Sequence, residues 1–385
     1  MAEILALNKI SNIGTDLLDK SEYSLVTELN KPDAIILRSY NMHDMELPES
    51  LKCVARAGAG VNNIPIGKCS EKGIVVFNTP GANANAVKEL VLAGLLMSSR
   101  KIYEGIKWSN TLTSDVAKTV EKGKSNFGGH ELAGKTIGIV GLGAIGVLVA
   151  DICLALGMNV IGHDPMLSVG SAWKISPLVK RAKNIDTLYA ESDFITLHIP
   201  YMDSTKNIIN AGIFGKLKDG VKLLNFSRGE LVNNEDLKTG LESKKIAYYI
   251  TDFPCEALLN VENVITIPHL GASTEEAEDN CAVMAIRQMV DFLEEGSIHN
   301  SVNFPNCQMP RTTQTRICVF HKNIPDVIGS VTKIISSKKI NIENMLNKSK
   351  GDYAYTILDV SEEGLNGIVA QLNSLDAVIK VRVIQ

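Results

Sequence analysis

The chain has 385 residues, 45% of them hydrophobic and 21% charged, which is typical of a soluble globular protein with two or three domains. Its formal net charge of −4 gives no reason to expect nucleic-acid binding. No apolar run is long enough to span a membrane, and residues 1–11 lack the features of a signal peptide, so we expect a cytoplasmic protein with no membrane partner.

The seven cysteines are scattered along the chain and form no CxxC or Cys/His cluster. An odd number of dispersed cysteines is typical of reduced thiols in a cytosolic protein. We therefore expect no disulfide framework and no metal site.

Residues 1–82 alternate short apolar runs with helical stretches, which predicts an α/β unit with a mostly parallel sheet. Its expected strands are Ile4–Leu7, Leu25–Leu29, Asp33–Leu37, Lys52–Ala55 and Ile74–Phe77. The fourth strand leads into Arg56, Gly58, Ala59 and Gly60, where backbone N–H groups and a fixed cation would suit an anionic ligand. The alternative is a surface loop with a solvated arginine.

A long helical pattern follows Pro80–Asn85 and is expected to carry the chain from the first domain into the second. Residues 121–130 are rich in Gly, Lys and Asn and are expected to form an exposed loop.

The stretch 135–146 reads as a buried strand that turns on glycines into a helix. The first glycine permits a tight turn, the second lets the backbone approach a pyrophosphate, and the third lets helix and strand pack closely. The helix N-terminus offers free N–H groups to the phosphate. The residues expected to bind a dinucleotide here are Gly141, Gly143, Ala144, Ile145 and Gly146.

A second strand, Met158–Gly162, leads to Asp164, whose carboxylate would accept hydrogen bonds from the adenosine ribose hydroxyls. A 2′-phosphate would be repelled there, and the next basic residue is Lys174. The sequence therefore favours NAD over NADP.

Four further apolar runs continue the α/β alternation, each ending in a polar loop. They are Phe194–Pro200, Val221–Phe226, Ile246–Asp252 and Val264–Ile267. Ser273 and Glu276 then form a capping box for a helix through about Glu294, which can return the chain to the first domain.

Arg228, Glu256 and His269 follow three of these strands, and ligands of open α/β sheets bind at the carboxyl ends of the strands. Hydride transfer from a hydroxy acid needs a base for the hydroxyl proton and a cation for the carboxylate. His269 suits the first task, Glu256 could orient it, and Arg228 suits the second. A lone histidine after a strand is more often structural, but the presence of Arg228 and Glu256 after other strands of the same unit favours a catalytic role for His269.

Residues 305–315 are expected to form a linker, and residues 316–385 fit a β-α-β-β-α-β pattern of the ferredoxin-like type. The expected strands are Arg316–His321, Ile340–Asn347, Tyr353–Val360 and Ile379–Ile384, with helices at about 326–338 and 363–374.

Four motifs now carry a family resemblance: RAGAGVNNIP at 56–65, GLGAIG at 141–146, NFSRGELVNNEDL at 225–237 and IPHLGASTEEAEDN at 267–280. Over nearly its whole length the chain resembles the D-2-hydroxyacid dehydrogenases, in a short form with a C-terminal ACT domain. The resemblance implies two Rossmann- or flavodoxin-like parallel-sheet domains, the first discontinuous, and a ferredoxin-like βαββαβ module. The implied boundaries are 1–82 and 283–304 for the substrate domain, 83–282 for the NAD domain, and 316–385 for the regulatory ACT domain.

The same resemblance assigns the catalytic roles to Arg228, Glu256 and His269. It adds these cofactor contacts: His198, Pro200, Thr205, Ser227, Asp252 and Gly271. Its substrate contacts are Arg38, Arg56, Gly58, Ala59, Gly60 and Asn83, although Arg38 could equally be a solvated surface residue. The family usually has an aspartate where this chain has Thr251, so the nicotinamide role of the neighbouring Asp252 is left open.

ACT domains bind small amino acids where two modules meet, and the resemblance points to His321, Asn323 and Asn341 as effector residues for L-serine. A glycine is usual where Asp326 stands, so a module used only for oligomerisation is the alternative. A homo-oligomer, dimer or tetramer, is expected.

The implied activity is NAD-dependent oxidation of 3-phospho-D-glycerate to 3-phosphohydroxypyruvate, the first step of serine synthesis. Two alternatives stay open. One is a dehydrogenase for another D-2-hydroxy acid, such as glycerate, glyoxylate or hydroxypyruvate. The other is a non-catalytic NADH-sensing corepressor of the same fold.

Overall fold

The computed structural model describes residues 1–28, 31–361, 365 and 367–385. The chain divides into two units, residues 1–82 with 275–385 and residues 83–274. This differs from the boundary expected at residue 283. The whole of α10 (Glu275–Glu295) belongs to the first unit, because Ala285, Met289 and Phe292 on one face of the helix are buried in the core of that unit.

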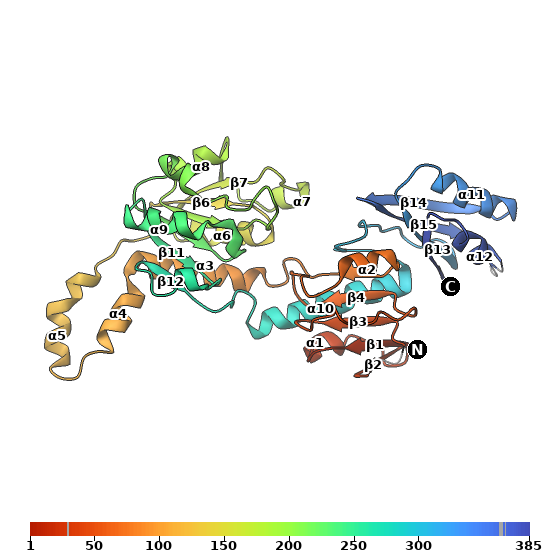
Figure 1. Ribbon diagram of the computed structural model, residues 1–385, viewed down its shortest axis with the longest axis horizontal. Coiled ribbons are helices and arrows are strands. Elements are labelled where there is room, and N and C mark those ends of the chain that lie inside the picture. The colour runs from red at the N-terminus through yellow and green to blue at the C-terminus, as the bar shows by residue number, and fades with distance from the viewer. Residues whose placement is uncertain (29–30, 362–364, 366) are drawn as a thin grey trace. The chain divides into compact units, whose positions relative to one another are not determined.

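The first unit contains a five-stranded parallel sheet of order β2-β1-β3-β4-β5, the flavodoxin-like order (Figure 1). All five expected strands are present within two residues, except that Leu29 lies outside the described residues. Their bounds are β1 (Ala2–Ala6), β2 (Tyr23–Val26), β3 (Ala34–Leu37), β4 (Cys53–Arg56) and β5 (Val75–Phe77), with helices α1 (Asn12–Thr15) and α2 (Ile66–Glu71).

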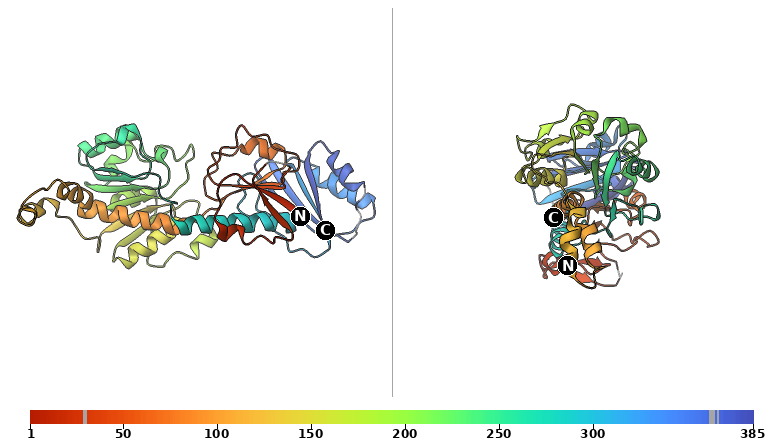
Figure 2. Two further views of the ribbon diagram at one scale, coloured as in Figure 1. Left: turned by 90° about the horizontal axis from the view of Figure 1, so that it is seen from below. Right: turned by 90° about the vertical axis from the view of Figure 1, so that its left-hand side faces the viewer.

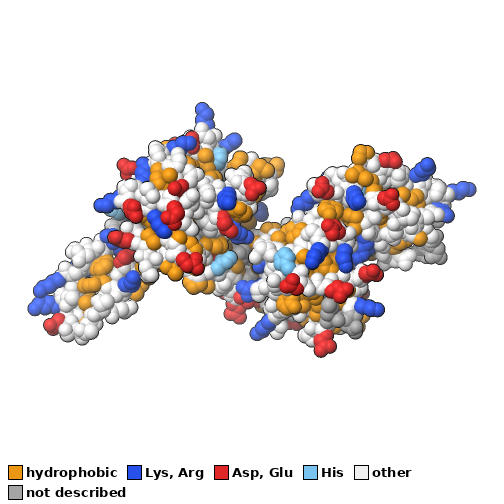
Figure 3. Space-filling model, in the orientation of Figure 1, with side chains coloured by type: hydrophobic (Ala, Val, Ile, Leu, Met, Phe, Trp, Pro, Cys, Tyr) orange, Lys and Arg blue, Asp and Glu red, His pale blue; other side chains and the backbone are white. Residues whose placement is uncertain are grey.

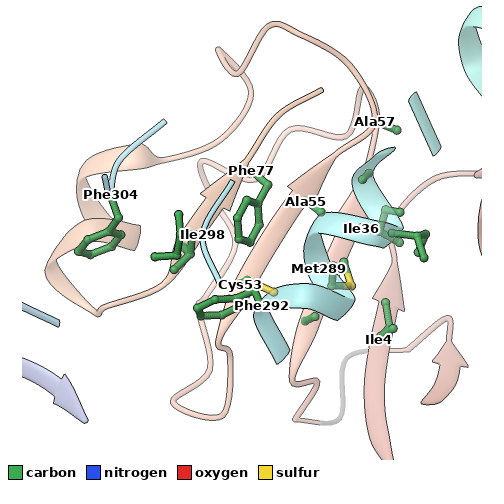
Figure 4. Close-up of a cluster of buried hydrophobic side chains, with 14 of the residues drawn as sticks. Ile4, Ile36, Cys53, Ala55, Ala57, Phe77, Met289, Phe292, Ile298 and Phe304 are labelled. Atoms are coloured by element: carbon green, nitrogen blue, oxygen red, sulfur yellow. The ribbon is translucent and has the colours of Figure 1, made fainter. Parts of the chain in front are cut away.

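Helix α10 covers one face of this sheet (Figure 4). Phe77 from β5 and Phe292 from α10 meet edge to face, with ring centroids 5.7 Å apart, and Met289 lies beside them in the same cluster. Edge-to-face contacts of this kind add to the apolar burial that holds helix and sheet together.

Residues 315–384 form the expected βαββαβ module, whose antiparallel sheet has the order β14-β15-β13-β16. Its elements are β13 (Thr315–Lys322), α11 (Val327–Ser337), β14 (Ile342–Lys350), β15 (Tyr353–Val360), α12 (Ile368–Asn373) and β16 (Val378–Ile384). Residues 363, 364 and 366 of the second expected helix lie outside the described residues. One face of the sheet carries the two helices (Figure 2), and the other face packs against the first domain through Phe320 and Tyr355.

The ACT-like module also supplies the hydrogen-bond donors for the C-terminal end of α10. Arg382 donates to Leu293 O at 3.0 Å, Arg316 to Glu295 O at 2.8 Å, and Tyr355 to Gly296 O at 2.8 Å. The last carbonyl groups of a helix have no partner within it and attract cations. The module is therefore joined to the first domain by specific polar contacts as well as by an apolar core.

The second unit contains a seven-stranded, all-parallel sheet of order β12-β11-β10-β9-β6-β7-β8, a Rossmann arrangement with one added strand. Helices α3 and α6 pack in the core on one face, and α8 and α9 in the core on the other. The strands are β6 (Thr136–Val140), β7 (Asn159–His163), β8 (Lys180–Arg181), β9 (Phe194–Leu197), β10 (Val221–Asn225), β11 (Ile246–Thr251) and β12 (Val264–Thr266). The helices are α3 (Ala84–Arg100), α6 (Ala144–Ala155), α7 (Val169–Ala172), α8 (Ile185–Glu191) and α9 (Asn234–Glu242), with 3-10 turns η2 (Ala211–Lys216), η3 (Gly229–Leu231) and η4 (Glu256–Leu258).

The prediction of an exposed loop at residues 121–130 is wrong for most of that range. Residues 102–127 form an arm of two helices, α4 (Ile102–Ser109) and α5 (Val116–Gly123), followed by the 3-10 turn η1 (Lys124–Phe127). The arm closes on itself through Trp108 and Phe127, whose ring centroids are 5.0 Å apart. Apolar side chains remain on its surface (Figure 3), so polar composition alone was a poor guide to its structure.

Asp359 on β15 is the counter-ion of Arg316, with Oδ1 2.6 Å from Nε and Oδ2 3.0 Å from Nη2, and both side chains are fully buried. Replacing Asp359 by Asn should lower the free energy of unfolding of the module by about 3–5 kcal/mol, because a buried guanidinium is left without its partner. Urea unfolding followed by circular dichroism measures the loss. The matched control is Glu121→Gln, which breaks an exposed ion pair with Lys124 and should cost less than about 1 kcal/mol. Equal losses in the two variants would contradict this account.

The same pair predicts how stability depends on pH. Burial raises the pKa of Asp359, but the hydrogen bonds from Arg316 and Thr312 outweigh burial and hold that pKa below its ordinary value. A lowered carboxyl pKa stabilises the fold above the unfolded pKa of about 4, and the contribution is lost as the pH falls through the folded value. The difference in free energy of unfolding between the wild type and Asp359→Asn, measured by urea unfolding at a series of pH values, should therefore be largest near neutral pH and shrink as the pH falls below about 4. A difference that does not change with pH would contradict this account.

Candidate active site

The glycine-rich turn joins β6 to α6 in the second unit. Gly141 has a φ of +94°, which favours glycine, and its N–H donates to His163 O at 2.9 Å. A Cβ on Gly146 would collide with the carbonyl oxygen of Gly141. These two glycines are therefore required by the turn and by the close packing of helix on strand.

Gly143 differs from its two neighbours because a Cβ there would meet nothing within 4 Å. It is the N-cap residue of α6, and Ala144 and Ile145 form the first turn of that helix. The chain places β7 on one side of β6 and β9 on its other side, so the strand order reverses at β6. Open α/β sheets bind their ligands at such a reversal. The open space at Gly143 lies at the place where a pyrophosphate would approach the helix N-terminus.

Asp164 follows β7 and is held beside this turn. Its Oδ2 accepts from Leu142 N at 2.9 Å and its Oδ1 accepts from Met166 N at 2.9 Å. Each carboxylate oxygen keeps a further acceptor site for a ribose hydroxyl. The fixed negative charge is unfavourable for a 2′-phosphate.

The loops after β9 and β10 use their hydroxyl groups locally. Thr205 Oγ1 donates to Pro200 O at 2.8 Å and accepts from Met202 N at 2.8 Å. Ser227 Oγ donates to Leu197 O at 2.7 Å. These side chains shape the loops that the sequence assigned to the cofactor.

His198 directly follows β9 and is half-buried. Its Nε2 lies 2.9 Å from Thr196 Oγ1, whereas its Nδ1 is buried without a hydrogen-bond partner. Burial lowers the pKa of His198 to about 3, so the ring is neutral at physiological pH.

The three residues predicted to be catalytic lie after three neighbouring strands: Arg228 after β10, Glu256 at the start of η4 after β11, and His269 after β12. All three side chains are exposed. Arg228 Nη1 donates to Ser227 O at 2.6 Å, and the ring of His269 packs 4.8 Å from the ring of Phe253. In the described part of the chain no hydrogen bond joins Glu256 to His269.

Asp252, the residue directly after β11, is fully buried. Its Oδ2 accepts from Gly271 N at 3.1 Å, so it anchors the loop that carries His269. Burial raises the pKa of Asp252, while that hydrogen bond and the charges of His269 and Arg228 act in the opposite direction. The structure thus brings the carboxylate within electrostatic reach of both candidate catalytic groups, which the sequence did not reveal.

Several observations fit a dinucleotide in this unit. Asp252 Oδ1 and His198 Nδ1 are buried polar atoms without partners, and such atoms are uncommon unless a ligand or water completes them. The Gly143 cradle is open, and Asp164 is fixed at the ribose position. Thr251, which stands where the family usually has an aspartate, uses its hydroxyl to accept from Phe253 N at 3.1 Å.

Of the candidate substrate residues, Arg38 follows β3 and Arg56 is the last residue of β4, at one edge of the first sheet. Arg56 Nε donates to Arg38 O at 3.0 Å, and Arg38 forms an ion pair with Glu278 of α10, a partner that the sequence did not indicate. A Cβ on Gly58 would lie 2.6 Å from the Arg56 guanidinium, so glycine leaves room for that cation.

The remaining candidates of this loop are held by backbone contacts. Asn78 donates its side-chain amide to Ala59 O at 2.7 Å, and Thr79 N donates to Gly58 O at 3.1 Å; Gly60 follows in the same loop. In the second unit, Asn83 is the N-cap residue of α3 and makes no side-chain capping bond, so its amide is available to a ligand.

The effector candidates are not brought together within one chain. His321 is buried and bonds Thr356 Oγ1 at 2.9 Å, and Asn323 donates to Gly351 O at 3.0 Å beside the β14–β15 turn. Asn341 donates to Glu343 at 2.7 Å at the other end of β14. A ligand touching both asparagines would require a second copy of the module.

The described residues contain no group of three or more His, Cys, Asp or Glu side chains that could hold a metal ion. All seven cysteines are free thiols. Within the described part of the chain, no helix combines the length and apolar character needed to cross a membrane.

The fold and these residues define a dinucleotide-binding unit of the Rossmann type. The family model of the D-isomer specific 2-hydroxyacid dehydrogenase NAD-binding domain matches residues 92–271. The chain belongs to the D-isomer specific 2-hydroxyacid dehydrogenase family, and its cofactor is NAD.

Three similar proteins illustrate the range of the match. The D-3-phosphoglycerate dehydrogenase of Archaeoglobus fulgidus is 36% identical over 301 residues, which cover 75% of this chain and 54% of that protein. The hydroxypyruvate reductase of Thermotoga maritima is 36% identical over 298 residues, 74% of this chain and 92% of that protein. The NAD⁺-bound 3-phosphoglycerate dehydrogenase of Entamoeba histolytica has 26% identity and a TM-score of 0.62, covering 78% of this chain and 98% of that one. The chain thus spans about half the length of the Archaeoglobus protein.

Gly143→Ala tests the dinucleotide cradle. The new methyl group meets no protein atom, so the melting temperature should not change, but it occupies the space where a pyrophosphate would approach. The Kd for NADH, measured by fluorescence titration, should rise at least about tenfold, a loss of 1.4 kcal/mol. Gly215→Ala, also in open space, is the control and should leave both quantities unchanged. Unaltered NADH binding in Gly143→Ala would show that the cofactor lies elsewhere.

Proposed function

We propose that the chain catalyses the NAD-dependent oxidation of 3-phospho-D-glycerate to 3-phosphohydroxypyruvate, the first step of L-serine biosynthesis. The observation that carries the chemistry is the position of Arg228, Asp252 and His269 at the carboxyl ends of adjacent parallel strands, in the same sheet as the glycine turn. The observation that favours a phosphorylated substrate is the pair Arg38 and Arg56 at one edge of the first sheet.

In this proposal Arg228 binds the substrate carboxylate and polarises the oxygen on C2. Its guanidinium is permanently charged and can meet two oxygens at once. His269 accepts the proton of the C2 hydroxyl, which becomes the carbonyl oxygen of the product. The hydride of C2 would be accepted by the nicotinamide of an NAD held by the glycine turn and Asp164. One proton and one hydride leave the hydroxy acid, so the oxidation is balanced.

The remaining candidates have supporting roles. Asp252 holds the His269 loop through Gly271 and stabilises positive charge on both catalytic groups. Glu256 is proposed to hold the second ring nitrogen of His269 once substrate is bound, since both side chains are exposed. Gly58, Ala59 and Gly60 would receive the substrate carboxylate, and Asn83 would contact the substrate from α3.

We place the protein in the cytoplasm as a homo-oligomer, either dimer or tetramer, with L-serine as an effector bound between two ACT-like modules. The separation of Asn323 and Asn341 within one chain supports a shared effector site. The free thiols support a reducing compartment.

A second candidate substrate is an unphosphorylated D-2-hydroxy acid, such as glycerate, with hydroxypyruvate or glyoxylate as the corresponding keto acid. The similarity to a hydroxypyruvate reductase favours it. The two candidate substrates differ in their need for Arg56, because a phosphate group requires that cation and an unphosphorylated hydroxy acid does not. The non-catalytic corepressor has less support, since the polar groups needed for turnover are all present.

His269→Ala should lower kcat by about 10²- to 10⁴-fold, because the general base is lost. NADH affinity should stay within about twofold, since the imidazole is not part of the glycine cradle. The rate of NAD⁺ reduction with 3-phosphoglycerate measures the first quantity and fluorescence titration the second. His130→Ala, at an exposed position of the same unit, is the control. Undiminished turnover in His269→Ala would refute the assignment, and turnover by neither protein with NADH binding intact would favour the corepressor.

Arg56→Gln tests the phosphate. A lost charge-assisted hydrogen bond costs about 1.5–3 kcal/mol, so the KM for 3-phosphoglycerate should rise about 10- to 100-fold while that for D-glycerate changes little. Steady-state kinetics with both substrates gives the ratio, and Arg287→Gln, an exposed arginine on α10, is the control. Equal rises in both KM values would favour the unphosphorylated substrate.

A further inference from the structure

A cleft of about 440 Å³ lies in the first unit where the ACT-like module meets the first domain. Its wall is formed by residues from both: Asn78, Asn300, Ser301, Pro305, Asn306, Lys348, Ser349 and Lys350. None of the residues discussed above as catalytic, cofactor or effector candidates belongs to this wall. A volume of this size accommodates a small metabolite.

The wall carries two ammonium groups and no carboxylate. On β14, Lys348 lies opposite Tyr355 and Lys350 opposite Tyr353, so both lysines project from the face of the sheet that packs against the first domain. Among the described residues, neither lysine forms an ion pair with a carboxylate. Lys350 Nζ donates to Ser301 O at 2.9 Å, which fixes its position at the cleft.

Amide side chains complete the wall as hydrogen-bond donors and acceptors. Asn78, Asn300 and Asn306 each carry an NH₂ group, and Ser349 adds a hydroxyl. Two cations with neutral donors and no competing anion match a small ligand with a phosphate or carboxylate group. The whole chain has a net charge of −4, so this local excess of positive charge does not follow from composition.

The cleft is connected to the loop of Gly58, Ala59 and Gly60 by short hydrogen bonds. Asn300 donates to Gln288 Oε1 at 2.6 Å, and Gln288 Nε2 donates to Asn78 O at 3.1 Å. The Asn78 side chain then donates to Ala59 O at 2.7 Å. Gln288 on α10 is only 5% exposed, so the middle of this chain of bonds is shielded from water, whereas the bond from Asn78 to Ala59 is exposed.

We propose that this cleft is a binding site for a small anion bearing a phosphate or carboxylate group, and that the bound anion alters substrate affinity through Asn78 and the 58–60 loop. The cleft shares no residue with the effector candidates His321, Asn323 and Asn341. Its effect on the substrate loop rests on the proposed function of that loop, whereas the binding of the anion does not.

Isothermal titration calorimetry tests binding directly. Inorganic phosphate and, separately, malonate are titrated into the full chain in the Arg56→Gln background at constant ionic strength, so that binding at the substrate loop is weakened. Lys348→Gln is compared with this parent, because Lys348 is exposed and its replacement should leave the fold intact. Lys338→Gln, an exposed lysine beyond α11, is the matched control. We expect saturable binding of at least one anion that weakens at least about tenfold in Lys348→Gln and not in the control. Absence of saturable binding, or equal affinity in Lys348→Gln and its parent for both anions, would overturn the proposal.

Comparing the two probes identifies the ligand class. Preferential loss of phosphate binding in Lys348→Gln indicates a phosphorylated ligand, and preferential loss of malonate binding indicates a carboxylate. The coupling is read from the KM for 3-phosphoglycerate with and without the bound anion, in otherwise wild-type protein and in Lys348→Gln. The anion competes at the substrate site equally in both proteins. If the cleft alters substrate affinity, the ratio of the KM with the anion to the KM without it should differ by at least about threefold between the otherwise wild-type protein and Lys348→Gln. Equal ratios would refute the coupling, and failure of turnover would refute the proposed function while leaving the calorimetric result intact.

Discussion

Parallel strand pairing is the constraint on which the second unit depends. Because β6 and β9 to β12 all run in one direction, their carboxyl ends share one edge of the sheet. The glycine turn, Arg228, Asp252 and His269 come from positions spread over more than a hundred residues of sequence, yet all of them follow strands that end at this edge. A one-residue slip in any pairing would turn the side chains of that strand to the opposite face and displace the loop that follows.

A buried carboxylate, Asp252, lies at this edge directly after β11. Burial of Asp252 is unfavourable for its charge, and the structure offsets the cost with the Gly271 N–H and with the permanent charge of Arg228. The same interaction holds the loop of His269 before any ligand arrives. Preorganisation of this kind lets the site stabilise developing charge without rearranging at the moment of reaction.

The structural features that depend on local geometry were predictable from the sequence. The positive φ of Gly141, the collision that forbids a Cβ on Gly146, and the strand bounds all follow from sterics and from hydrophobic periodicity. The anchoring of Gly271 by Asp252 was not predictable, because it joins residues 19 apart whose loops meet only in the folded sheet. The Arg38–Glu278 ion pair and the capping of α10 by Arg316 and Arg382 depend on still longer separations. The helical arm at 102–127 was missed in part because its helices bury no residue, so its composition resembles that of a loop.

The central claim is that the polar groups at this edge bind a hydroxy acid and take its hydroxyl proton, while its C2 hydride would pass to the bound cofactor. The most direct measurement uses 3-phosphoglycerate carrying deuterium at C2, with mass spectrometry of the reduced cofactor and the steady-state rate as readouts. Our account predicts that the deuterium is recovered in the reduced cofactor and that turnover is slower than with the protium substrate if hydride transfer limits the rate. Reduced cofactor without deuterium, or no cofactor reduction with this or any other D-2-hydroxy acid, would contradict it.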